Sequence, residues 1–203
     1  SLNYLWVSGN ETMFKGCNKL PAAHYLTYSK EGDMHMARYW ELEEPKLNSI
    51  TNNEEAVKEE LAKVLELSVK RHMVADVPVS SFLSGGLDSS LIAVLAKKSN
   101  QSLSTYTIST GAEDRKIEMM PDDLKYAKWV ADNYQLDHHV IEIKPDILKD
   151  FPKMVRTLDE PIGDPAAINT FLICKAAREK GVKVLLSGMG ADEIFFGYRR
   201  QKA

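Results

Sequence analysis

Two short segments begin with serine and glycine and have an acidic residue a few positions later, a pattern that suits phosphate chemistry. The first, called the first loop below, reads Ser-Gly-Gly-Leu-Asp-Ser-Ser from Ser84 to Ser90 and follows the apolar stretch Val79 to Leu83. A turn between a strand and a helix points the free N–H groups of the helix start outward, where they attract phosphate. Gly85 and Gly86 permit the backbone conformations that the close approach of a bulky anion requires. The segment therefore predicts a phosphate-binding loop.

Asp88 is the unusual residue of the first loop, because a carboxylate repels phosphate unless a divalent cation lies between them. Two familiar nucleotide motifs do not match: the Walker loop GxxxxGK[ST] requires a lysine, and the dinucleotide fingerprint requires GxGxxG. The alternative is that Asp88 only caps a helix in a tight strand-to-helix turn.

The whole string resembles the pyrophosphate loop SGGxDS[ST] of the N-type ATP pyrophosphatases, and every position matches. In that superfamily the loop holds the pyrophosphate of ATP while a carboxylate or similar oxygen attacks the α-phosphate, which releases pyrophosphate and leaves an adenylate. The resemblance implies ATP and Mg²⁺ as ligands and an adenine nucleotide alpha hydrolase-like fold. It leaves the second substrate open.

A second segment of this kind, the second loop, runs from Ser187 to Tyr198 after the apolar stretch Val182 to Leu186. If both apolar stretches are strands of one parallel sheet, both loops emerge at its carboxyl edge, where such sheets bind ligands. Asp88 and Asp192 could then share a magnesium ion bound to ATP, since hard cations prefer carboxylate and phosphate oxygens. The alternative is two unrelated helix caps.

The second loop, Ser-Gly-Met-Gly-Ala-Asp-Glu-Ile-Phe-Phe-Gly-Tyr, resembles the SGxGxDExFxGY signature of glutamine-hydrolysing asparagine synthetases and the related β-lactam synthetases. Asp159-Glu160-Pro161 and Asp164 extend the resemblance. It implies a ligase that adenylates the side-chain carboxylate of aspartate and amidates it with ammonia from glutamine, giving asparagine, AMP and pyrophosphate. It also implies a homodimer.

Carried over by position, the resemblance assigns roles to particular residues. Leu83, Ile108 and the Ser187-Gly188 turn border the adenosine, although Leu83 and Ile108 could instead be plain strand core. Glu160 and Asp164 either approach the same cleft or have a capping or surface role. The magnesium ligands are Asp88 and Asp192. The implied ATP-binding residues are Leu83, Ser84, Gly85, Gly86, Asp88, Ser89, Ser90, Ile108, Ser187 and Gly188.

Met189 departs from the family, which usually has an acid there to help deprotonate ammonia; methionine cannot take a proton. The departure keeps open a related amidotransferase or β-lactam synthetase-like enzyme acting on another carboxylate, such as a sugar acid. A nucleotide-binding module without turnover is a further alternative. The catalytic residues stay unknown, because the family's lysine follows Ala203 and its glutaminase cysteine precedes Ser1. We expect these 203 residues alone to be inactive.

The elements that must position both loops follow from the residue patterns. Tyr, Thr and Trp around a Glu-Gly-Asp turn predict a hairpin over 23–29 and 35–42. Beyond it, apolar residues at helical spacing predict a helix over 54–72 that packs through one stripe, Val57 to Val69. Strands are expected at 79–83, 103–109, 139–143 and 182–186, with helices at 88–98, 122–134 and 167–180. This alternation predicts a doubly wound, mainly parallel α/β sheet.

Two domains are expected: residues 1–45 as the C-terminal β remnant of a glutaminase domain, and 46–203 as the ATP-binding part of a synthetase domain. Apolar residues make up 44% and charged residues 27%, which excludes a disordered chain. A net charge of −3 and the absence of a cluster of Lys and Arg argue against binding of nucleic acid. No apolar run in the sequence is long enough to cross a membrane. We expect a cytoplasmic protein whose separated Cys17 and Cys174 are reduced packing residues.

Overall fold

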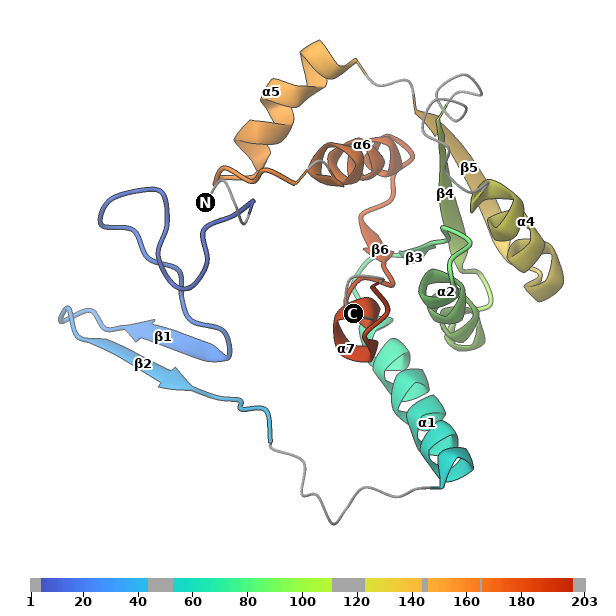
Figure 1. The fold of residues 1–203 in the computed structure, drawn as a ribbon, viewed down its shortest axis with the longest axis horizontal. Helices are drawn as coiled ribbons and strands as arrows, with labels where there is room; N and C mark the ends of the chain where they lie inside the picture. The colour runs from blue at the N-terminus through green and yellow to red at the C-terminus, as the bar shows by residue number, and fades with distance from the viewer. Residues whose placement is uncertain (1–4, 44–52, 111–122, 144–145, 165, 199–203) are drawn as a thin grey trace. The chain divides into compact units, whose positions relative to one another are not determined.

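The computed structural model describes residues 5–43, 53–110, 123–143, 146–164 and 166–198. They belong to two compact units, one formed by residues 1–53 and 147–169 and the other by 54–146 and 170–203 (Figure 1). The boundary expected between residues 45 and 46 lies outside the described residues and stays a prediction.

The first unit contains the predicted hairpin. β1 (His24–Tyr28) pairs antiparallel with β2 (Met34–Arg38), with Leu26 opposite Met36. Ser29 closes the connection, because its N–H donates to Asp33 O at 2.9 Å and its Oγ accepts the Asp33 N–H at 3.1 Å. The prediction of a hairpin is confirmed. The unit also contains a helix that the sequence patterns did not predict, α5 (Ile147–Thr157), which has Pro152 in its interior.

The second unit is a parallel sheet with helices between its strands. In chain order it has α1 (Glu54–His72), β3 (Val79–Phe82), α2 (Leu87–Ser99), β4 (Ser104–Thr110), α4 (Asp123–Tyr134) and β5 (Asp137–Ile143). After α6 (Ala166–Glu179), which begins in the first unit, come β6 (Val184–Leu186) and α7 (Ala191–Phe195).

The strand order is β5-β4-β3-β6, and each neighbouring pair is parallel. The chain steps outward from β3 through β4 to β5 and then returns to place β6 on the other side of β3. The order of the sheet therefore reverses between β3 and β6. The predicted parallel α/β sheet is confirmed, with β6 two residues shorter at its start than expected.

Two groups of buried side chains join the helices to this sheet. Leu83 packs with residues of α2 and α4 in one group, which includes Ala93 and Val130. In the other, Val69 of α1 packs with Leu95, Ala96 and Leu103. The expected stripe along α1 is wrong in its first half, because Val57, Leu61 and Val64 are exposed; only the last turns of α1 reach α2.

Both cysteines are free and exposed, so the prediction that they pack in the interior is wrong. No helix among the described residues combines the length and the apolar character that a membrane span requires.

Candidate functional site

A cavity of about 440 Å³ lies at the carboxyl ends of β3 and β6, where the order of the strands reverses. Both loops line it, and so do residues of β4 and α6. In open α/β sheets this reversal opens a crevice in which ligands bind. The cavity falls within the range of roughly 300–1,000 Å³ typical of small-molecule sites. The structure thus brings together two loops that are about a hundred residues apart in the sequence.

The first loop is held by hydrogen bonds between its own residues. Ser89 is 7% exposed, and its Oγ accepts the Ser84 N–H at 3.1 Å. The two hydroxyls lie 2.7 Å apart, and Ser89 Oγ also donates to Gly86 O at 3.3 Å. The loop is therefore shaped before any ligand arrives.

Helix α2 starts inside this loop, at Leu87, without a side-chain cap. Its N-cap residue is Gly86, in an extended conformation, and no side chain hydrogen-bonds to the N–H groups of the first turn there. Free N–H groups and the helix dipole make such a start attractive to an anion. The charge of Asp88 in the same turn opposes this attraction.

The second loop contacts the start of α2 through Gly188. A Cβ atom built on Gly188 would lie 2.8 Å from Ser89 N and 2.9 Å from Asp88 Cβ. Contacts of this length do not occur for real side chains, so only glycine allows the two loops to approach each other this closely. The glycine is required by the meeting of the loops, independently of any ligand.

Most of the residues predicted from the sequence lie on this cavity. They are Leu83, Ser84, Gly86, Asp88, Ser89, Ile108, Ser187 and Gly188, together with the predicted metal ligand Asp192. Gly85 and Ser90 instead line a separate hollow between α2 and α4. Gly85 has φ +82°, and a Cβ there would lie 2.5 Å from Asp123 O and 2.7 Å from Ala127 N. This glycine therefore allows α4 to pack against the loop.

Sequence reasoning missed several lining residues. Tyr106 stands two residues before Ile108 on β4, so the alternation of strand side chains could have indicated it. Thr170 and Ile173 come from α6, which the sequence predicted as a helix at 167–180 without indicating that it lines the cavity. The others are Phe82, Thr107, Asp123, Gly190, Glu193 and Tyr198.

The lining of the cavity is acidic. Among the described residues that line it are Asp88, Asp123, Asp192 and Glu193, and no lysine or arginine. Tyr198 donates its hydroxyl to Glu193 Oε1 at 2.5 Å. No group of three or more His, Cys, Asp or Glu side chains in the described ranges is arranged to hold a metal ion by itself. A cation here would need ligands beyond the protein, such as phosphate oxygens and water.

Comparison with known proteins decides the family. The model of the family described as asparagine synthase matches residues 60–203. The chain belongs to the asparagine synthase family. A putative glutamine-hydrolysing asparagine synthetase of Mycobacterium tuberculosis is 41% identical over 153 residues, which cover 73% of this chain and 22% of that protein. Asparagine synthetase 1 of Bacillus subtilis is 32% identical over 198 residues, or 97% of this chain and 30% of that protein.

The chain thus spans less than a third of the length of these two relatives. Among solved structures, the NH3-dependent NAD synthetase of Campylobacter jejuni aligns with a TM-score of 0.45 and 15% identity, over 69% of this chain and 60% of that chain. The parallel sheet and its order are established by the strand pairing itself.

Met189, which lies in the region that matches the asparagine synthase family, is the third residue of the second loop. It lines the cavity and is 81% exposed. Its N–H donates to Ser187 Oγ at 3.2 Å, and the next residue, Gly190, has φ +100°. The thioether therefore stands at the mouth of the cavity, where it offers no group that can transfer a proton.

Glu160 and Asp164 belong to the first compact unit. Glu160 forms an ion pair with Lys19, and Asp164 Oδ1 accepts the N–H of Ala166, the first residue of α6, at 2.9 Å. Asp164 thus has the capping role that was one of its two expected alternatives. The approach of Glu160 to the cleft stays a prediction.

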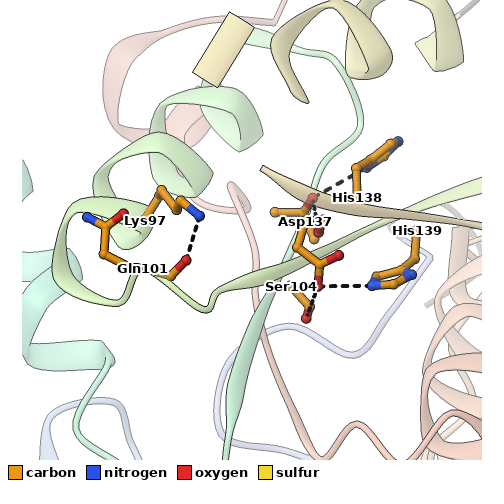
Figure 2. A network of polar contacts seen from close by, with 7 residues as sticks. Lys97, Gln101, Ser104, Asp137, His138 and His139 are labelled. Carbon is orange, nitrogen blue, oxygen red and sulfur yellow. Dashed lines mark hydrogen bonds and ion pairs between the residues drawn. The ribbon is translucent and has the colours of Figure 1, made fainter. Parts of the chain in front are cut away.

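A polar network lies at the opposite end of the sheet, at the first residues of β4 and β5 (Figure 2). Ser104 Oγ donates to Asp137 Oδ2 at 2.7 Å, and His139 Nε2 lies 3.1 Å from the same oxygen. The hydrogen bond from Ser104 and then that of His139 lower the pKa of Asp137. Burial, followed by the charge of His139, lowers the pKa of His138. Because its hydrogen bonds join the first residues of β4 and β5, we interpret the network as stabilising the pairing of these two strands.

Proposed function

We propose that this chain is the ATP-binding part of a glutamine-dependent asparagine synthetase. The observation that carries the proposal is the single cavity lined by both loops at the reversal of strand order. The match to the asparagine synthase family supports the same conclusion. The proposed ligands are ATP and Mg²⁺, and the proposed location is the cytoplasm.

The first loop would bind the pyrophosphate of ATP. The hydroxyls of Ser84 and Ser89 are occupied by bonds within the loop, so the main contacts would come from N–H groups at the uncapped start of α2. Donors fixed before the ligand arrives need no reorganisation as charge moves onto the leaving pyrophosphate. Leu83, Ile108 and the Ser187-Gly188 turn would border the adenosine.

Asp88 and Asp192 fit a magnesium ion that is held jointly with ATP. Both line the cavity, and an acidic lining without basic residues needs a cation before a triphosphate can enter. Magnesium usually takes one or two carboxylates, several waters and substrate phosphate oxygens, which suits a site with two protein ligands. When bound, it would neutralise charge on the phosphates.

In the intact enzyme, the aspartate carboxylate would attack the α-phosphate, forming a C–O–P linkage and expelling pyrophosphate. Ammonia from glutamine would then displace AMP and give asparagine. The contribution of this chain would be to hold the nucleotide in line for the attack. Aspartate, glutamine and a second copy of the chain are the proposed partners. The residues that grip aspartate are not assigned to this chain, which we expect to be inactive alone.

A related amidotransferase is the second candidate, and Met189 is the observation that favours it. The exposed thioether occupies the mouth of the cavity without a group to accept a proton from ammonia. The intact enzyme could therefore act on another carboxylate, such as a sugar acid, with the same nucleotide chemistry.

Binding of ATP tests the role of the chain. In calorimetric titrations with ATP and MgCl₂, we expect binding by the chain and a loss of at least about tenfold in affinity for Asp88→Ala, since a metal ligand is removed. Asp76→Ala, at an exposed aspartate outside the cavity, is the matched control. Equal affinity of Asp88→Ala and the parent chain would refute the role of Asp88.

Exchange between ATP and pyrophosphate by the intact enzyme separates the candidates. Exchange that depends on aspartate supports asparagine synthesis, and exchange that depends on a sugar acid supports the related amidotransferase. If the intact protein bound ATP but showed no exchange with any carboxylate, both enzymatic proposals would be refuted. The result would instead support a nucleotide-binding module.

A further inference from the structure

A loop inside the family-matched region is bound by residues that precede that region. The loop runs from Asp159 to Asp164, and we call it the 159–164 loop. Its Glu160 Oε2 lies 3.0 Å from Lys19 Nζ, and its Gly163 N–H donates to Leu5 O at 2.7 Å. Both partners lie in the chain before residue 60, where the family match begins. All of these residues belong to one compact unit.

Lys19 joins three parts of this unit. Besides the ion pair, its Nζ donates to Val7 O at 2.8 Å. Its side chain is 34% exposed and that of Glu160 is 21% exposed, so water screens the pair less than it screens a pair on the open surface. The ammonium group is thus fixed by a backbone carbonyl on one side and by the loop carboxylate on the other.

Glu160 depends on this lysine. Its Oε1 is buried and has no hydrogen-bond partner within the described ranges, and its Oε2 is bound by Lys19. Removing one partner of a partly buried ion pair leaves the other charge poorly compensated, which costs more than the pair itself contributes. The carboxylate would then turn toward water and take the loop with it.

The 159–164 loop has little freedom to adjust while it keeps its contact with Leu5. Asp159 has φ +60°, a conformation that non-glycine residues adopt only when their surroundings hold them. A Cβ on Gly163 would lie 3.3 Å from Leu5 Cδ2, so the two segments are closely packed. Losing the anchor at Glu160 should therefore open the contact at Gly163.

We infer that Lys19 is a positioning residue: through Glu160 it fixes the 159–164 loop to the segment that precedes the family-matched region. The hydrogen bond from Gly163 to Leu5 reports this state, because it closes only when the loop is in place. The inference concerns the connection between two parts of the chain, and it holds whether or not the chain binds ATP.

Amide hydrogen exchange followed by NMR on the full 203-residue chain tests it. In Lys19→Met, which keeps an unbranched side chain one atom shorter and removes its charge, the Gly163 amide should exchange about tenfold faster, as expected for the loss of a charge-assisted contact. Amides of β4 and β5 should exchange as in the parent. Lys19→Arg, which keeps the charge and the donors, should restore most of the protection.

The matched control is Lys15→Met, at an exposed lysine four residues away. Raising the salt concentration should speed exchange at Gly163 in the parent and have less effect in Lys19→Met, because screening acts on the ion pair. Equal exchange at Gly163 in Lys19→Met and Lys15→Met would overturn the inference. So would an equal acceleration in β4 and β5, which would indicate a general loss of stability.

Discussion

The two loops that line the cavity share a serine-glycine start but are constructed differently. The first is linked internally by the hydroxyls of Ser84 and Ser89 and lies against α2 and α4. The second ends in a short helix, α7, and leaves Ile194 and Phe196 69% exposed. Similar sequence patterns therefore give one loop with a buried serine at the centre of its hydrogen bonds and one that depends on a glycine for its close contact with α2.

This difference separates two kinds of glycine. Gly188 is needed because the second loop touches the backbone of the first. Gly86 has an ordinary φ of −70°, and a Cβ there would meet only Ser84 Oγ at 3.4 Å. A loop that is held by contact fails when the contact is blocked, whereas a loop held by hydrogen bonds fails when its hydroxyls are removed.

Blocking the contact should have the largest effect. In Gly188→Ala, the new Cβ meets main-chain atoms of α2 that cannot move aside, so we expect a loss of about 2 kcal/mol in the free energy of unfolding by urea. Binding of ATP with magnesium should weaken by more than about tenfold, since the two loops separate. Gly86→Ala is the control for stability and should unfold like the parent; equal stability of both variants would contradict the comparison.

Removing the central hydroxyl of the first loop should have a smaller effect. Ser89→Ala leaves the partly buried N–H of Ser84 without its acceptor, and we expect a loss of about 1 kcal/mol on thermal or urea unfolding. Ser99→Ala, at an exposed position of the same helix, is the matched control. If the two variants were equally stable, internal hydrogen bonds would not hold the first loop.

The smallest effect should come from the far end of the sheet. The lowered pKa of His138 means that the unfolded chain binds its proton more readily, so acidification below about pH 6.5 should cost stability. In His138→Gln, the fall in melting temperature between pH 7.5 and 5.5 should be shallower than in the parent. His72→Gln, on the surface of α1, controls for the loss of an imidazole. If the melting temperature fell equally in the parent and in His138→Gln, protonation of His138 would not be the cause of the loss of stability at low pH.

The sequence predicted what local rules determine. The residues before each serine-glycine turn located β3 and β6 correctly, although β3 reads Val-Ser-Ser-Phe and the residues of β6 are only half-buried. Helix periodicity located α1 but not its packing: Val57 and Leu61 repeat at helical spacing, yet they are exposed. Periodicity shows which residues share a face, and tertiary structure determines whether that face is covered.

Other features depend on contacts that no local pattern reports. Pro152 lies inside α5 although a proline disfavours the interior of a helix, because tertiary packing can outweigh a local preference. Gly85 and Gly86 are adjacent and chemically identical, yet Gly86 lines the cavity whereas Gly85 allows α4 to approach. Thr170 and Ile173 line the cavity only because the chain returns from β5 to place β6 beside β3.

The brevity of β6 has a consequence for folding. It is three residues long and pairs with a strand more than a hundred residues earlier, whereas β3, β4 and β5 pair as successive neighbours. Closing so long a stretch of chain costs entropy that only a few contacts repay. We expect β6 to join the sheet late during folding and to detach early under denaturant, so the capacity to hold a nucleotide would be acquired last and lost first.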